Sequence, residues 1–246
     1  MAVNNTNNDN SNNNASTKKN KPLIIIISIL VILVLASIGA RLYPANKENA
    51  KSVNREALAS LDFFLFESPR KLAPVTLDNM QGEGKPFAEH LAGWRLVNFG
   101  YMFCPDICPI NLSFLNDVKT TWDAEQGAQS SKNAPANSTP LNVLHITFDP
   151  ERDKPKLLNQ YLTYMNPDFY GLTSDVESIR AITQQLNVVF IYEEPDERGH
   201  YFITHSDSMA LINPQGEYVG LFKGPYNKES MLEALEVVIG TDVEHL

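Results

Sequence analysis

Cys104 and Cys108 are the two cysteines of this sequence, and three residues separate them. They follow an apolar stretch, Leu96–Phe99, that is typical of a buried strand. They precede Pro109, and proline favours the first position of a helix. We therefore expect both cysteines on a loop at a helix N-terminus, where free N–H groups and partial positive charge favour thiolates. Paired thiolates suit a soft ion such as Cu(I), and disulfide exchange also requires them.

The spacing of the pair separates these two uses only in part. Redox thioredoxins place two residues between their cysteines, whereas three residues give the sulfurs more freedom to lie on either side of a metal. A structural disulfide is a third interpretation, but closing so short a loop constrains little chain entropy. The spacing therefore favours a metal-binding or redox-active pair over a structural one.

A third metal ligand would come from the five histidines of the chain. His145 is expected to pack in the core because its neighbours are apolar, and His90 has no obvious partner. His200 follows a turn and His245 is near the C-terminus, so both are expected to be exposed or mobile. His205 precedes a predicted strand, on a loop that lies beside the cysteine loop in a thioredoxin-like fold. The residues alone leave open whether His205 is a ligand or a solvated histidine.

The elements that must position these residues alternate between strands and helices. Residues 123–140 are rich in Ser, Asn, Ala and Pro, and they are expected to form a surface insertion. Ser174 and Glu177 form a capping-box pattern at the start of one helix. The order predicts an α/β fold, a thioredoxin-like mixed sheet flanked by helices. Apolar runs and helical stripes predict the elements: strands over 61–66, 73–77, 96–99, 141–148, 188–192, 208–212 and 217–222, and helices that begin near 109, 155, 174 and 227.

Three segments precede the predicted domain, which spans residues 61–246. Residues 1–20 are an Asn-rich tail with few apolar side chains, and this composition predicts disorder. Residues 21–42 contain the uncharged run Leu23–Ala40, which is long enough to predict a transmembrane anchor. Residues 43–60 form a polar tether. A cleaved signal peptide is the alternative for the apolar run, although the apolar core of a signal is typically about 7–15 residues.

The charges on either side of the apolar run suggest an orientation. Lys18, Lys19 and Lys21 precede it, and the positive-inside rule then favours a cytoplasmic N-terminus. The protein is therefore expected to cross the inner (cytoplasmic) membrane once, with its domain facing the periplasm. The net charge of −9 disfavours nucleic acid as a partner, because polyanions repel an acidic domain.

Three blocks of the sequence resemble the signature of the Sco/SenC copper-chaperone family. They are Phe99–Pro109, Phe148–Pro155, and His205-Ser206 with the segment that leads to Gly216, and they occur in the family's order. A single N-terminal span followed by an external domain also resembles the family. Met102 and Lys154 stand where Thr is common, and the insertion is long. None of these departures falls on a cysteine or on His205.

The resemblance implies that Cys104, Cys108 and His205 bind copper, as Cu(I) and Cu(II). It implies a metallochaperone that receives copper from a donor protein and delivers it to the dinuclear copper site of cytochrome c oxidase subunit 2, or to another copper enzyme. The alternative is an enzyme, a thiol-disulfide oxidoreductase in which Cys104 and Cys108 form a redox disulfide and reduce the copper-ligand cysteines of a partner. A peroxidase of the same fold is a weaker interpretation. Asp106 is expected to be a solvated loop carboxylate.

Overall fold

The computed structural model describes Leu30, residues 53–130 and residues 140–241. The predicted tail and nearly all of the predicted anchor lie outside these residues. Among the residues that are described, no helix is long and apolar enough to cross a membrane. Helix α2 (Arg55–Ala59) falls within the segment that was expected to be a tether, and its Leu58 is buried in the core. The end of that segment is therefore part of the folded unit.

Eight strands form one mixed sheet in the order β1-β10-β9-β4-β5-β6-β2-β3. The β4–β5 and β5–β6 pairs are parallel, and the other pairs are antiparallel. The strands are β1 (Phe63–Arg70), β2 (Thr76–Asn79), β3 (Gly84–Pro86), β4 (Trp94–Gly100), β5 (Leu141–Thr147), β6 (Tyr170–Thr173), β9 (Ser208–Ile212) and β10 (Tyr218–Lys223). A separate two-stranded sheet pairs β7 (Phe190–Tyr192) with β8 (Ile203–His205).

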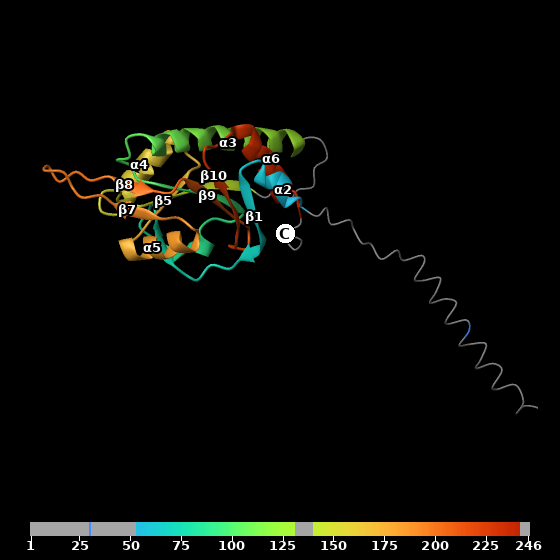
Figure 1. Ribbon diagram of the computed structural model, residues 1–246, viewed down its shortest axis with the longest axis horizontal. Helices are drawn as coiled ribbons and strands as arrows, with labels where there is room; N and C mark the ends of the chain where they lie inside the picture. Colours follow the sequence, from blue (N-terminus) through green and yellow to red (C-terminus); the bar gives the residue numbers. More distant parts are fainter. Residues whose placement is uncertain (1–29, 31–52, 131–139, 242–246) are drawn as a thin grey trace, which may run out of the picture. The chain divides into compact units, whose positions relative to one another are not determined.

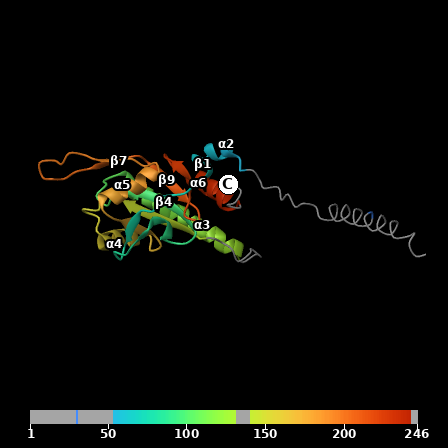
Figure 2. The same ribbon diagram turned by 90° about the horizontal axis from the view of Figure 1, so that it is seen from below.

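Helices cover both faces of the main sheet, which explains why every residue of β4 is buried. Helices α3 (Ile107–Ser130), α4 (Pro155–Met165) and α6 (Lys228–Ile239) lie on one face, and α5 (Val176–Gln185) lies on the other (Figure 1). Each face has its own apolar cluster. This α/β arrangement is thioredoxin-like, so the predicted fold class is confirmed for the described domain. The β7–β8 hairpin extends beyond the body of the domain in both views (Figures 1 and 2).

The predicted start of one helix and the predicted cap of another were wrong. Helix α3 begins at Ile107 and not at Pro109, so Cys108 lies in its first turn. The first turn tolerates proline because none of its N–H groups has a partner within the helix. The same helix continues to Ser130, into the predicted insertion, of which residues 131–139 lie outside the described part. The side chain of Asp175, and not that of Ser174, caps α5 by accepting from Ser178 N–H.

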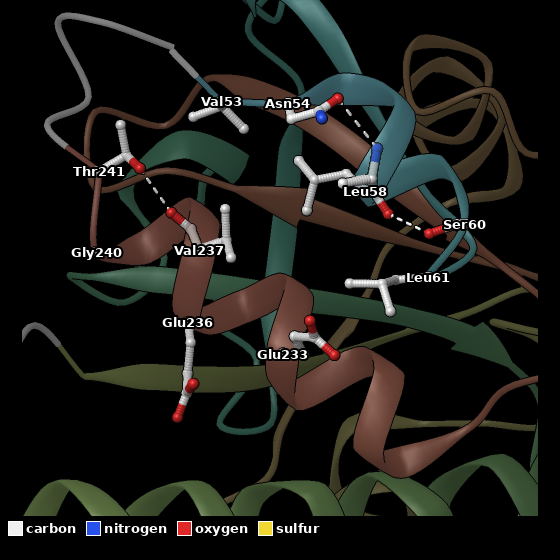
Figure 3. Close-up of a pocket in the computed structure, with 11 residues that line it drawn as sticks. Val53, Asn54, Leu58, Ser60, Leu61, Glu233, Glu236, Val237, Gly240 and Thr241 are labelled. Carbon is white, nitrogen blue, oxygen red and sulfur yellow. Dashed lines mark hydrogen bonds between the residues drawn. The ribbon is translucent and has the colours of Figure 1, made fainter. Parts of the chain in front are cut away.

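A cavity of about 510 Å³ lies between α2 and the C-terminal end of α6 (Figure 3). Leu58, Leu61 and Val237 contribute apolar side chains to its wall, and Glu233 and Glu236 contribute carboxylates. Neither cysteine lines it, and neither does any histidine among residues 53–130 and 140–241. The cavity is therefore separate from the residues that the sequence marks for chemistry.

Candidate metal centre

The cysteine pair lies where β4 gives way to α3. Cys104 is partly exposed on the connecting loop, whereas Cys108 is only 1% exposed, and both are free thiols. The Cys108 N–H donates to the Cys104 sulfur over 3.4 Å. The free N–H groups of a helix N-terminus thus reach the first cysteine, as the sequence predicted.

His205 brings the third donor atom to the two sulfurs. It ends strand β8, where a loop residue was expected, and its register partner is Phe190. Its Nδ1 lies 3.0 Å from the Ser206 carbonyl oxygen. A carbonyl can only accept, so Nδ1 carries the proton and Nε2 keeps a free lone pair. That Nε2 lies 3.7 Å from the Cys108 sulfur.

The three candidate ligand atoms converge. One donor atom from each of Cys104, Cys108 and His205 lies within 4.8 Å of the other two. Two sulfurs and one imidazole nitrogen at these separations could surround a single ion after small side-chain adjustments. Such a donor set is soft, which suits Cu(I), and imidazole also suits Cu(II).

Several hydrogen bonds hold the hairpin that carries His205 against the domain. The Tyr192 hydroxyl donates to the Phe148 carbonyl over 2.6 Å, and the Tyr201 hydroxyl donates to Asp149 Oδ1 over 2.8 Å. The Ile203 N–H donates to the Tyr101 hydroxyl over 3.2 Å. Two of these bonds reach the segment that follows β5, so that segment fixes where the hairpin presents His205.

Arg152 adds further contacts between the hairpin and the domain. Its Nε forms an ion pair with the fully buried Asp149, and its guanidinium carbon lies 3.8 Å from the centroid of the Tyr201 ring. A second guanidinium nitrogen donates to the Tyr201 carbonyl over 3.2 Å. The planar guanidinium therefore bonds and stacks at once, which a lysine cannot reproduce. The sequence placed Asp149 and Arg152 in a family-like block but assigned them no role.

Burial dominates the electrostatic surroundings of Cys108. Burial raises the pKa of the Cys108 thiol far above its ordinary value, and a hydrogen bond with Cys104 raises it further. Burial also raises the pKa of Asp153 to about 6, although Thr147 and the Met102 N–H donate to its carboxylate. The helix N-terminus was expected to favour the thiolate of both cysteines, but at Cys108 burial outweighs it and favours the thiol.

The structure also places most of the other candidate residues, and His90, for which the sequence indicated no partner, has several. His200 and Asp106 are exposed, and His245 lies outside the described residues. His90 is buried, and its Nε2 is 3.0 Å from the Leu77 carbonyl oxygen. His145 is buried as predicted, and both its Cε1 atom and the Cys108 sulfur lie close to Gly100, which the sequence did not indicate. In the parallel register His145 lies opposite Asn98 on β4.

The fold and the cluster define a class: a thioredoxin-like domain whose cysteine loop and a distant histidine form a candidate metal site. Residues 67–240 match the family model described as SCO1/SenC. This chain therefore belongs to the SCO1/SenC family.

Individual relatives agree with this assignment. A "Putative copper-binding protein" from Stutzerimonas stutzeri is 31% identical over 176 residues, which are 71% of this chain and 80% of that protein. The mitochondrial SCO1 homologue of Mus musculus is 34% identical over 149 residues, and the match covers 61% of this chain but only 49% of the mouse protein. The crystal structure of yeast Sco1 with copper bound has a TM-score of 0.61 and 26% identity, and covers 71% of this chain and 91% of that one.

Proposed function

We propose that this protein binds one copper ion through Cys104, Cys108 and His205 and transfers it to a copper enzyme. The convergence of the three donor atoms within 4.8 Å carries the proposal. Family membership supports it, as do the names of two relatives: the Stutzerimonas stutzeri protein is named for copper binding, and yeast Sco1 was solved with copper bound. Copper is the cargo of this site, so the protein acts as a metallochaperone and completes no catalytic cycle.

The surroundings of the cysteine loop support transfer as well as binding. Cys104 is partly exposed, so an incoming thiolate or imidazole can reach an ion that Cys104 holds. Phe103 and Ile110 expose 57% and 56% of their surface beside it, and Ile107 is also exposed. Exposed apolar residues around a reactive site are typical of a protein interface. We propose that the copper donor and the recipient dock here in turn.

The expected recipient is the dinuclear copper site of cytochrome c oxidase subunit 2, or the site of another copper enzyme. We propose that residues 21–42 anchor the protein in the inner membrane, with the N-terminus in the cytoplasm and the domain in the periplasm. The uncharged run Leu23–Ala40 and the lysines before it support this orientation. An anchored domain would stay close to a recipient that is itself in the membrane.

A copper titration of the full chain, in both oxidation states, tests the proposal. Wild-type protein should bind one copper ion, and Cys104→Ser and Cys108→Ser should lose stoichiometric Cu(I). His205→Ala should weaken binding and change the Cu(II) spectrum. His200→Ala is the matched control, because His200 is exposed on the same hairpin and lies outside the cluster. Full affinity and an unchanged spectrum in His205→Ala would refute the three-ligand site.

Transfer needs its own measurement. Copper-loaded protein is mixed with the metal-free copper domain of cytochrome c oxidase subunit 2, and the absorption of the dinuclear site is followed. Appearance of that absorption with wild-type protein, but not with the cysteine variants, supports delivery. Stable retention of copper by this protein in the presence of every copper-enzyme domain tried would contradict delivery.

Thiol-disulfide exchange is the second candidate function, since both cysteines are free and adjacent. It would reduce a disulfide in the recipient while Cys104 and Cys108 are oxidised to their own disulfide, so two electrons and two protons leave this protein. This activity needs both cysteines but has little need of His205. Reduction of the oxidised recipient by metal-free His205→Ala protein would favour it, and no reduction under any supply of reductant would exclude it.

A further inference from the structure

The Asp207 carboxylate connects the segment that carries His205 to helix α3. Its Oδ1 accepts a hydrogen bond from the side-chain amide of Asn111 over 3.1 Å and another from the Tyr226 hydroxyl over 2.9 Å. Asn111 is only 4% exposed, and Asp207 and Tyr226 are partly buried. Hydrogen bonds to a carboxylate are stronger than bonds between neutral groups, and burial strengthens them further. The carboxylate is therefore a firm link between elements that are far apart in the chain.

This link lies next to the candidate metal centre. Asp207 is two residues after His205, and Asn111 is three residues after Cys108 in the same helix. Residues three apart are neighbours on one face of a helix. Cys108 Sγ and His205 Nε2 are themselves 3.7 Å apart. Helix α3 and residues 205–207 are therefore joined twice, once by the hydrogen bond and once at the candidate centre, and the hydrogen bond limits how far the sulfur and the nitrogen can separate.

Gly224 leaves the space that the carboxylate occupies. A β-carbon built on Gly224 would lie 2.5 Å from Asp207 Oδ2, which is too short for a real β-carbon. The ring of Tyr226 packs against Phe114 of α3, with centroids 5.7 Å apart, so the second donor is also held in place. The carboxylate thus fits a site built by α3 and the segment that follows β10. A solvated surface aspartate would have no such fixed surroundings.

The other polar contacts of residues 205–207 lead away from α3. The Ser206 N–H donates to the Val189 carbonyl over 3.0 Å, and the Val189 N–H donates to Ser206 Oγ over 3.1 Å. Both bonds stay within the segment around the hairpin. Among the described residues, the bond from Asn111 to Asp207 is the one hydrogen bond that joins residues 205–207 to α3, apart from the contact at the candidate centre itself.

We propose that Asp207 is a positioning residue, which holds the His205 imidazole at the distance from Cys108 at which both can bind one copper ion. Asp207 is not a ligand, because it lies outside the cluster of donor atoms. The carboxylate fixes residues 205–207 against α3 in the metal-free protein, and a preorganised site loses less entropy on binding. Two thiolates alone suit Cu(I), whereas imidazole suits Cu(II), so the positioning should chiefly support Cu(II) binding. This inference rests on the proposed copper-binding function.

Nuclear magnetic resonance on the metal-free full chain tests the positioning without copper. Wild-type protein should give a nuclear Overhauser contact between the ring protons of His205 and the β protons of Cys108, whose side chains meet at 3.7 Å. Asp207→Ala should weaken this contact. Asp207→Asn should keep it, because the amide oxygen can accept the same two hydrogen bonds. An unchanged contact in Asp207→Ala, or equal weakening in both variants, would overturn the proposal.

Copper titration measures the consequence at the centre. In Asp207→Ala the Cu(II) affinity should fall about tenfold and the Cu(I) affinity by less than about threefold, and Asp207→Asn should restore most of the Cu(II) affinity. Asp175→Ala is the matched control, because this aspartate caps α5 by accepting from the Ser178 N–H. It should lower stability and leave both affinities unchanged. Equal losses of Cu(I) and Cu(II) affinity in Asp207→Ala, or the same change in Asp175→Ala, would refute the proposal. Failure of the wild type to bind copper would refute the proposed function, while the metal-free contact would still decide whether Asp207 positions His205.

Discussion

Cys108 Sγ and His205 Nε2 lie 3.7 Å apart although the two residues are 97 positions apart in the sequence. The cysteine belongs to the first turn of α3 in the main body, and the histidine ends β8 in a separate two-stranded sheet. The main sheet does not fix this distance. It depends on the contacts that hold the hairpin, so those contacts are as important to the centre as the ligands.

The two thiols should differ in reactivity before copper binds. Cys104 is partly exposed, whereas Cys108 is buried and burial raises its pKa, so iodoacetamide at pH 8 should alkylate Cys104 at least about tenfold faster. Peptide mass spectrometry of the reduced, metal-free protein measures both rates. Cu(I) should protect both residues. Equal rates for the two thiols would show that Cys108 is accessible in solution, and Cys104→Ser should show only the slow reaction.

Gly100→Ala should lower both the stability of the protein and its copper affinity. The added methyl group would meet the Cys108 sulfur at 2.9 Å and His145 Cε1 at 3.1 Å, and overpacking of this kind costs about 1–3 kcal/mol. Urea unfolding should show that loss, and copper affinity should fall because the sulfur moves. Gly82→Ala is the control for a glycine substitution with no neighbour within 4 Å; its positive φ of 80° costs stability but leaves copper binding unchanged. Wild-type copper affinity in Gly100→Ala would contradict the close packing.

Loss of the Tyr201 hydroxyl should reduce copper affinity more than it reduces overall stability. Tyr201→Phe removes its 2.8 Å hydrogen bond to Asp149 and loosens the hairpin that carries His205. We expect copper affinity to fall about 2–10-fold, the equivalent of about 0.5–1.5 kcal/mol for one hydrogen bond. Hydrogen exchange of the β8 amides should accelerate at the same time. Tyr164→Phe, at a residue that is 87% exposed, should change neither measurement. Unchanged exchange in Tyr201→Phe would show that other contacts suffice.

His145 should make folding stability depend on pH. Burial lowers its folded-state pKa to about 4, while the unfolded chain binds this proton near pH 6.5. The stabilising contribution is therefore complete above pH 6.5 and is lost as the pH falls towards 4. The free energy of unfolding therefore falls by about 3 kcal/mol over this range. Urea unfolding at several pH values gives the free energy of unfolding of wild type and of His145→Phe. The slope of this free energy against pH should be steeper for wild type.

The comparison with the variant is necessary because Asp153 acts in the opposite direction. Its pKa is raised to about 6 by burial, so its contribution is present at low pH and is lost as the pH rises from about 4 to about 6. Both proteins contain Asp153, so its effect cancels in the difference. Parallel pH profiles for wild type and His145→Phe would contradict the burial of a neutral ring. His200→Asn should follow the wild-type profile because His200 is exposed.

Local patterns in the sequence determined much of the architecture. The apolar runs 96–99, 141–148 and 208–212 became β4, β5 and β9, because central strands covered on both faces are mostly apolar. Cys104 was placed correctly on the loop between a strand and a helix, whereas Cys108 was expected on the same loop and lies in the first turn of α3. The position of Pro109 within α3 was misjudged, since a proline fits any residue of the first helical turn. Boundaries of this kind depend on packing around the helix start.

The tertiary structure alone decided how the centre is assembled. The sequence left His205 open until a family resemblance favoured it, because no local pattern records which strand end meets which loop. The anchoring of the hairpin by Tyr201 and Asp149, and the position of His145 and Cys108 close to Gly100, arise from strand register and side-chain packing. Such contacts join residues far apart in the chain, and their distances are set by the whole fold. The residue types fixed the possible chemistry, and the packing of β4, β5 and the β7–β8 hairpin brought the atoms within reach.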